Sequence, residues 1–159
     1  MYEKILVAYD GTEQARKALE TAIEFAKVFN SKIHLLTVIP ELIIPVFPDE
    51  GYGVGYPTIP VKGVKKDITD YSDKAEEIYG KILNLAFEEV VEKHPKIEVI
   101  PKLSEGKPST VIVEMAETED VDLIIMGSRG LGSVRGIILG STSRRVVDTC
   151  ERPIMIVKD

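Results

Sequence analysis

The residues with the clearest chemical potential form a glycine-rich segment between residues 127 and 143. Gly127 and Gly130 are followed, after nine further residues, by Gly140 and then by three hydroxyl residues, 141–143. Glycines let a backbone approach a ligand without a Cβ clash. Hydroxyls and N–H groups at the start of a helix attract anions. The clustering therefore favours a phosphate-binding segment over a purely structural loop.

Charge is distributed unevenly along the chain, and this supports a small anionic ligand. The formal net charge of the 159 residues is −6. Residues 127–147 contain four arginines and no acidic residue, so the remainder carries −10. The acidic total argues against a general nucleic-acid binder, which would have a basic face. A single polyanion held locally at the glycine segment is the better interpretation.

Other well-known motifs are absent or incomplete in the sequence. A dinucleotide G-x-G-x-x-G starting at Gly130 fails because Arg135 occupies the third glycine position, and no Walker G-x-x-x-x-G-K-[ST] sequence exists. The lone Cys150 excludes an intrachain disulfide and a cysteine-rich metal site. We expect His34 to be a satisfied or surface histidine, and His94 to mark a helix end.

A second loop that suits a ligand follows the first apolar run. Residues 4–9 (KILVAY) are typical of a strand buried on both faces, and Asp10 and Gly11 come directly after them. Asp10 has two compatible roles. It caps the following helix, with Glu13 completing a capping box, or it faces a ligand.

The elements that must position these loops alternate regularly between strand and helix. We expect strands over 4–9, 32–39, 97–103, 123–126 and 154–157, and helices over 15–30, 71–92, 108–119 and 141–149. This pattern predicts an α/β fold, an open five-stranded parallel sheet with helices on both faces. Ligands bind such sheets beyond the carboxyl ends of the strands, where the strand order reverses. The length suits one domain over residues 1–159.

Residues 40–70 interrupt this alternation, and we interpret them as a long excursion within the domain. They are rich in proline and contain a tract of glycine and tyrosine at 51–57 with no sustained period. Tyr52 and Tyr56 either close over a ligand, meet a partner chain or are disordered. No apolar run reaches the roughly 18 residues of a membrane helix. We expect a cytoplasmic protein with no membrane partner.

Four segments together resemble the universal stress protein family. The glycine spacing reproduces that family's G-x2-G-x9-G-[ST] nucleotide motif, and residues 4–11 (KILVAYDG) resemble its first strand and Asp turn. Residues 35–38 (LLTV) and 152–157 (RPIMIV) look like its second and closing strands. Thr37 departs from the His found in many members. The resemblance implies a Rossmann-like, adenine nucleotide α-hydrolase-like fold and an ATP site.

Residue by residue, the resemblance implies which positions contact ATP. Ala8 and Asp10 line the adenosine side, the Val38 backbone holds the adenine edge, and Met126 packs near the base. The remaining implied contacts wrap the ribose and phosphates: Gly127, Ser128, Arg129, Gly130, Leu131, Gly132, Ser133, Gly140, Ser141, Thr142 and Ser143.

The activity expected from this site is binding rather than efficient catalysis. The segment supplies phosphate donors, but we find no Walker-B acid and no residue that would position an attacking water, so we assign no catalytic residue. Mg²⁺ or Mn²⁺ would sit mainly on the phosphates. We expect an ATP-binding regulatory or stress-response protein, at most a weak ATPase. The alternatives are a metal-dependent nucleotide hydrolase or transferase, and an interaction module that binds no nucleotide.

The last strand suggests self-association. Residues 154–157 are apolar and are expected at a sheet edge, where an uncovered strand invites pairing. The family resemblance also implies homodimers through this strand.

Overall fold

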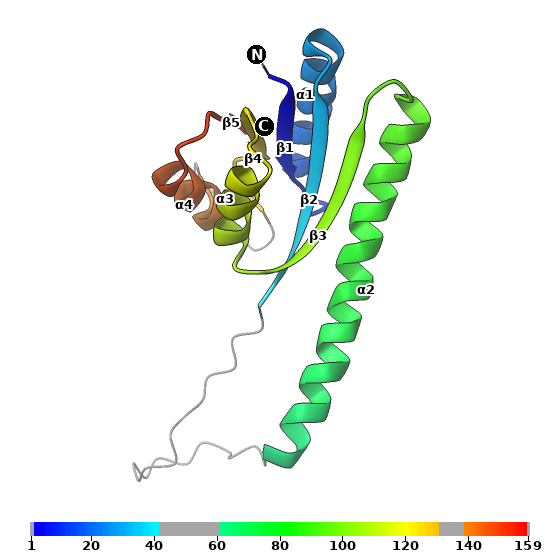
Figure 1. The fold of residues 1–159 in the computed structure, drawn as a ribbon. Coiled ribbons are helices and arrows are strands. Elements are labelled where there is room, and N and C mark those ends of the chain that lie inside the picture. The colour runs from blue at the N-terminus through cyan, green and yellow to red at the C-terminus, as the bar shows by residue number, and fades with distance from the viewer. Residues whose placement is uncertain (1, 42–60, 131–138, 159) are drawn as a thin grey trace.

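The computed structural model describes residues 2–41, 61–130 and 139–158, with the backbone alone for residues 61–70. Within these residues the chain forms a five-stranded parallel sheet in the order β3-β2-β1-β4-β5 (Figure 1). The strands are β1 (Lys4–Ala8), β2 (Lys32–Pro40), β3 (Val99–Gly106), β4 (Leu123–Gly127) and β5 (Ile154–Val157). The predicted fold class is confirmed, and β5 lies at a sheet edge as expected.

Four helices cover the two faces of the sheet. They are α1 (Glu13–Phe29), α2 (Val61–Lys93), α3 (Pro108–Thr118) and α4 (Ser141–Thr149). Successive side chains of a strand point to opposite faces. Accordingly, Ile5 and Val7 of β1 pack in one hydrophobic cluster with α1 and α2, and Leu6 packs in a second with α3 and α4. Both faces of the central strand are therefore buried.

The α2 helix differs from the sequence prediction in its start, and its buried face follows helical periodicity at Ala75, Ala86 and Val90 but not at every position. It begins at Val61, ten residues before the predicted start at 71, so the end of the predicted excursion is helical. Ile78 and Leu85, which helical periodicity favours as core residues, are 57% and 59% exposed. Leu83 takes a core position instead. Helical spacing alone does not distinguish Ile78 and Leu85 from Leu83 as core residues. Packing against the rest of the protein decides which of them is buried.

The described helices give no indication of a membrane span. Within the parts of the chain that the structure describes, none of them combines the length and the hydropathy that such a segment needs.

Candidate functional site

The strand order places two sequence-distant loops side by side. β1 lies between β2 and β4. The chain adds β2 and β3 on one side of β1 and then β4 and β5 on the other side, so the strand order reverses between β1 and β4. The loops that follow these two strands meet at the carboxyl edge of the sheet, the position where open α/β sheets bind ligands. A cavity of about 360 Å³ opens there. This volume lies in the range of small-molecule sites.

Most of the residues singled out from the sequence line this cavity. They are Ala8, Asp10, Val38, Met126, Gly127, Arg129, Gly130, Gly140, Ser141, Thr142 and Ser143. Ser128 is buried and is not among the lining residues. The predicted contacts at Leu131, Gly132 and Ser133 lie outside the described residues. The exposed Arg144 and Arg145 also do not line the cavity, so Arg129 is the arginine that the described lining includes.

The turn after β1 holds the carboxylate of Asp10 in place. Its Oδ1 accepts hydrogen bonds from the Thr12 backbone N–H at 3.0 Å and from the Thr12 hydroxyl at 2.6 Å. The residue that caps α1 is Thr12, whose Oγ1 accepts from the N–H of Ala15 at 3.2 Å. The predicted capping box with Asp10 as cap and Glu13 as its partner is therefore wrong. Asp10 instead supports the capping residue and lines the cavity.

Two glycines at the end of β4 allow the loops to approach each other. A Cβ on Gly127 would lie 2.8 Å from the Cβ of Gln14 in the first turn of α1. A Cβ on Gly130 would lie 2.7 Å from Oδ2 of Asp10. Both distances are below 3.0 Å, which is closer than a Cβ atom comes to a non-bonded heavy atom in real structures. These glycines thus serve the packing of the two loops in addition to any ligand.

The start of α4 is arranged so that its backbone faces the cavity. Gly140 is the N-cap and makes no side-chain cap hydrogen bond. Its N–H donates to the Ser128 carbonyl at 2.7 Å, and the Ser143 hydroxyl donates to the same carbonyl at 2.8 Å. These bonds fix the helix start on the β4 loop. The first N–H groups of a helix have no partner inside it, and a cavity lined by residues 141–143 suits an anion.

The cavity also contains residues that sequence reasoning missed. They are Tyr9, Ala15, Leu36, Pro40, Tyr79, Pro108 and Ile112. Leu36 and Pro40 follow from the parallel pairing of β2 with β1, because neighbouring strands end at the same edge. Tyr79 lies in the middle of a helix, and no local pattern marks it.

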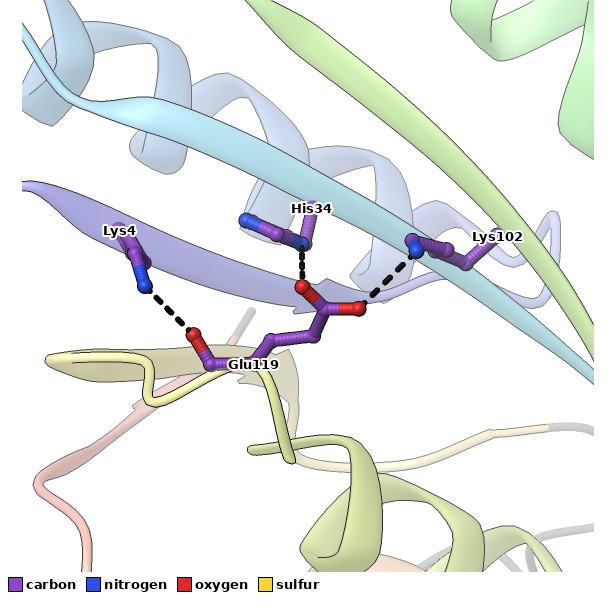
Figure 2. Close-up of polar contacts among 4 residues, drawn as sticks. All are labelled: Lys4, His34, Lys102 and Glu119. Atoms are coloured by element: carbon purple, nitrogen blue, oxygen red, sulfur yellow. Dashed lines mark hydrogen bonds and ion pairs between the residues drawn. The ribbon is translucent and has the colours of Figure 1, made fainter. Parts of the chain in front are cut away.

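A second polar cluster surrounds His34 (Figure 2), and its residues Lys4, His34, Lys102 and Glu119 do not line the cavity. His34 is 3% exposed, and its Nδ1 lies 3.7 Å from Oε2 of Glu119. Lys102 pairs with the other oxygen of Glu119 at 3.0 Å, and Lys4 donates to the Glu119 carbonyl at 2.8 Å. Burial lowers the pKa of His34, and the carboxylate of Glu119 opposes this effect. The expectation of a satisfied or surface histidine is wrong for the described structure, because Nδ1 is buried without a hydrogen bond.

Comparison with known proteins matches nearly the whole chain to one protein family. The model of the universal stress protein family matches residues 1–158. Universal stress protein YxiE of Bacillus subtilis is 31% identical over 158 residues, which cover 99% of this chain and 100% of that protein.

Solved structures agree with the sequence comparison. The structure of MJ0577 from Methanocaldococcus jannaschii is 29% identical, has a TM-score of 0.79, and covers 100% of this chain and 97% of that one. A universal stress protein in complex with cAMP and one from Archaeoglobus fulgidus in complex with dAMP share the fold, with TM-scores of 0.56 and 0.61 at 20% and 19% identity. Each of these alignments covers 99% of this chain, with 97% and 98% of the respective neighbours. The chain therefore belongs to the universal stress protein family.

Proposed function

We propose that this protein binds ATP in the cavity between the ends of β1 and β4, and that nucleotide occupancy is its regulatory signal in a stress response. The observation that carries the proposal is the composition of one cavity. It joins an apolar wall, the carboxylate of Asp10 and the N-terminus of α4 at the point where the strand order reverses. Two proteins of the same fold that hold adenine nucleotides support this assignment.

The lining residues suggest how the parts of ATP are distributed. Val38, Met126 and Ile112 provide apolar surface for the adenine ring, and the Val38 backbone offers hydrogen bonds to its edge. Gly130 and the α4 N-terminus suit the phosphates, together with the guanidinium of Arg129. Base and phosphates thus take different walls of the cavity.

A divalent cation would be held mainly by the phosphates. Among the described residues, no group of three or more His, Cys, Asp or Glu side chains lies close enough together to hold a metal ion. Mg²⁺ and Mn²⁺ accept such a site because they keep several water ligands. Weak or absent hydrolysis is expected, since no described lining residue is placed as a second carboxylate beside Asp10.

The proposal is tested by nucleotide binding to the purified protein. Mass spectrometry of the purified protein should find ATP or ADP, and calorimetry with MgATP should show one site per chain. Gly130→Ala should weaken ATP binding by about 10-fold or more, because the new Cβ meets Asp10 inside the cavity. Gly80→Ala in α2 is the control, since its Cβ would make only an ordinary 3.7 Å contact with Leu103.

Two outcomes would replace the proposal with an alternative. A wild-type protein with no bound nucleotide and no calorimetric signal would favour an interaction module. Metal-dependent release of ADP or AMP well above background would favour a hydrolase or transferase.

We also propose that the protein is a homodimer that pairs through β5. This strand is at the edge of the described sheet, and its four residues are apolar and half-buried. An edge strand of this kind presents unpaired backbone groups to a second copy. Sedimentation at micromolar concentration should show a dimer, and a stable monomer would contradict the proposal.

A further inference from the structure

The α2 helix contributes a tyrosine to the cavity, next to the turn that holds Asp10. Tyr79 is half-buried and is the residue that α2 supplies to the described lining. Ile82 lies one helical turn further along. Its Cγ2 is 3.1 Å from the position that a Cβ on Gly11 would occupy. This turn of α2 therefore packs directly on the Asp10–Gly11 turn, which fixes where Tyr79 enters the cavity.

The surroundings of Tyr79 keep its hydroxyl protonated. Burial raises the pKa of Tyr79, and the nearby Tyr71 and the carboxylate of Asp10 raise it further. At neutral pH the side chain therefore presents one O–H donor and two acceptor lone pairs. The carboxylate of Asp10 is oriented by Thr12 through Oδ1. Tyr79 and Asp10 thus both line the cavity, and they are close enough for the carboxylate of Asp10 to affect the pKa of Tyr79.

The chemistry of this part of the cavity matches a sugar rather than a base or a phosphate. The apolar residues gather on the walls from β2, β4 and α3, and the anion-binding groups gather at Gly130 and the start of α4. A nucleotide that spans both walls leaves its ribose beside the Asp10 turn. A ribose presents two vicinal hydroxyls, each a donor and an acceptor.

We propose that Tyr79 is a specificity-determining residue that bonds a ribose hydroxyl together with Asp10, so that the protein selects ribonucleotides over deoxyribonucleotides. This inference rests on the proposed ATP site and goes beyond it, because it assigns sugar recognition to a helix outside the glycine motif. A site built to bond a hydroxyl rejects the analogue that lacks it, since its polar groups are left unpaired.

The test compares three nucleotides on matched variants by calorimetry with Mg²⁺ present. The probes are ATP, 2′-deoxy-ATP and 3′-deoxy-ATP. Wild-type protein should bind ATP about 10-fold more tightly than at least one deoxy analogue. Tyr79→Phe keeps the ring and removes only the hydroxyl. It should weaken ATP binding and leave affinity for that analogue unchanged, so the selectivity ratio falls towards one.

The control is Tyr2→Phe, the same chemical change at a residue that packs against Phe25 and Phe29, away from the cavity. It should leave all three affinities unchanged. The inference is overturned if Tyr79→Phe keeps the wild-type ratio of affinities for ATP and the deoxy analogues. It is also overturned if wild type binds ATP and both deoxy analogues equally well. In either case the ATP site stands. A wild type that binds none of the three nucleotides overturns the proposed function and the inference together.

Discussion

The imidazole of His34 faces the carboxylate of Glu119 at 3.7 Å, across the interface between β2 and the end of α3 (Figure 2). The side chain of His34 is 4% exposed and that of Glu119 is 28% exposed. The histidine is therefore surrounded by protein, while the carboxylate remains in contact with solvent and with Lys102. Burial disfavours the charged imidazolium, so the pKa of His34 lies below its ordinary value.

Stability should fall in acid because of this histidine. The pKa of His34 is lowered by folding, whereas an unfolded histidine titrates at about 6.5. At pH values between these two pKa values, the unfolded chain binds more protons than the folded protein. The stabilising contribution of neutral His34 is therefore complete above the unfolded pKa, and it is lost as the pH falls through the folded pKa. One such group contributes a slope of up to about 1.4 kcal/mol per pH unit. Urea unfolding of wild type and His34→Gln between pH 7.5 and 5 measures it.

The chain offers a matched control, because its other histidine is His94 at the end of α2. His34→Gln should flatten the slope, whereas His94→Gln leaves the His34–Glu119 pair intact and should retain the part of the slope that His34 contributes. Glu119→Gln removes the carboxylate that favours the imidazolium, so the pKa of His34 in the folded variant should fall further. The loss of stability in acid should then continue to a lower pH than in wild type. Parallel profiles for wild type and His34→Gln would disprove the assignment.

Replacing Gly127 should destabilise the fold itself. The Cβ of Gly127→Ala would lie 2.8 Å from the Cβ of Gln14 and 3.0 Å from its carbonyl carbon, so backbone must move. Overpacking of this kind costs about 1–3 kcal/mol. Gly80→Ala should be neutral or stabilise by up to about 1 kcal/mol, because alanine favours a helix and its Cβ finds room. Equal midpoints of thermal unfolding for the two variants would contradict this prediction.

Ser143 should contribute to stability through its hydroxyl. That group is buried and donates to the Ser128 carbonyl at 2.8 Å. Ser143→Ala should therefore reduce the free energy of unfolding by about 1 kcal/mol. Ser141 is exposed on the same helical turn, so Ser141→Ala should change stability by less than about 0.5 kcal/mol. Chemical denaturation without nucleotide separates this effect from ligand binding, and a larger loss in Ser141→Ala would reverse the assignment.

Thr12 should stabilise α1 as its N-cap. Thr12→Ala removes the acceptor for the Ala15 N–H and the donor to Asp10, and should cost about 1 kcal/mol. Thr12→Ser retains the hydroxyl and should restore most of this loss. Unfolding midpoints in urea provide the comparison, and an equal loss in both variants would show that the methyl group, rather than the cap, matters.

Much of the fold is readable from the sequence because its signals are local. α4 begins and ends at the predicted residues, 141 and 149, and β5 matches 154–157. Apolar runs and glycine breaks mark these elements without reference to the rest of the chain. The buried face of α2 is only partly readable in this way, since Ala75, Ala86 and Val90 are buried as the periodicity favours, whereas Ile78 is exposed and Leu83 is buried. The choice between them depends on how the helix lies on the sheet.

The same distinction applies to the candidate site. Asp10, Gly130 and Gly140 follow strand ends or open a helix, so parallel topology alone brings them together. Tyr79 reaches the cavity only through the packing of α2 on the Asp10–Gly11 turn, which no short-range pattern encodes. Asp10 and Thr12 are both good capping residues, so residue type alone does not decide which of them caps α1.

The adjacency of β1 and β4 has a consequence for how the protein is made. Ile5 pairs with Leu123, and the carboxylate of Asp122 accepts hydrogen bonds from the N–H groups of Glu3 and Lys4. Contacts so far apart in sequence carry a high entropic cost, because a long loop must close to form them. A nascent chain that has left the ribosome only as far as α3 lacks one wall of the cavity. A nucleotide bound in this cavity, as proposed above, would therefore require β4 to be in place, and it would stabilise the completed sheet.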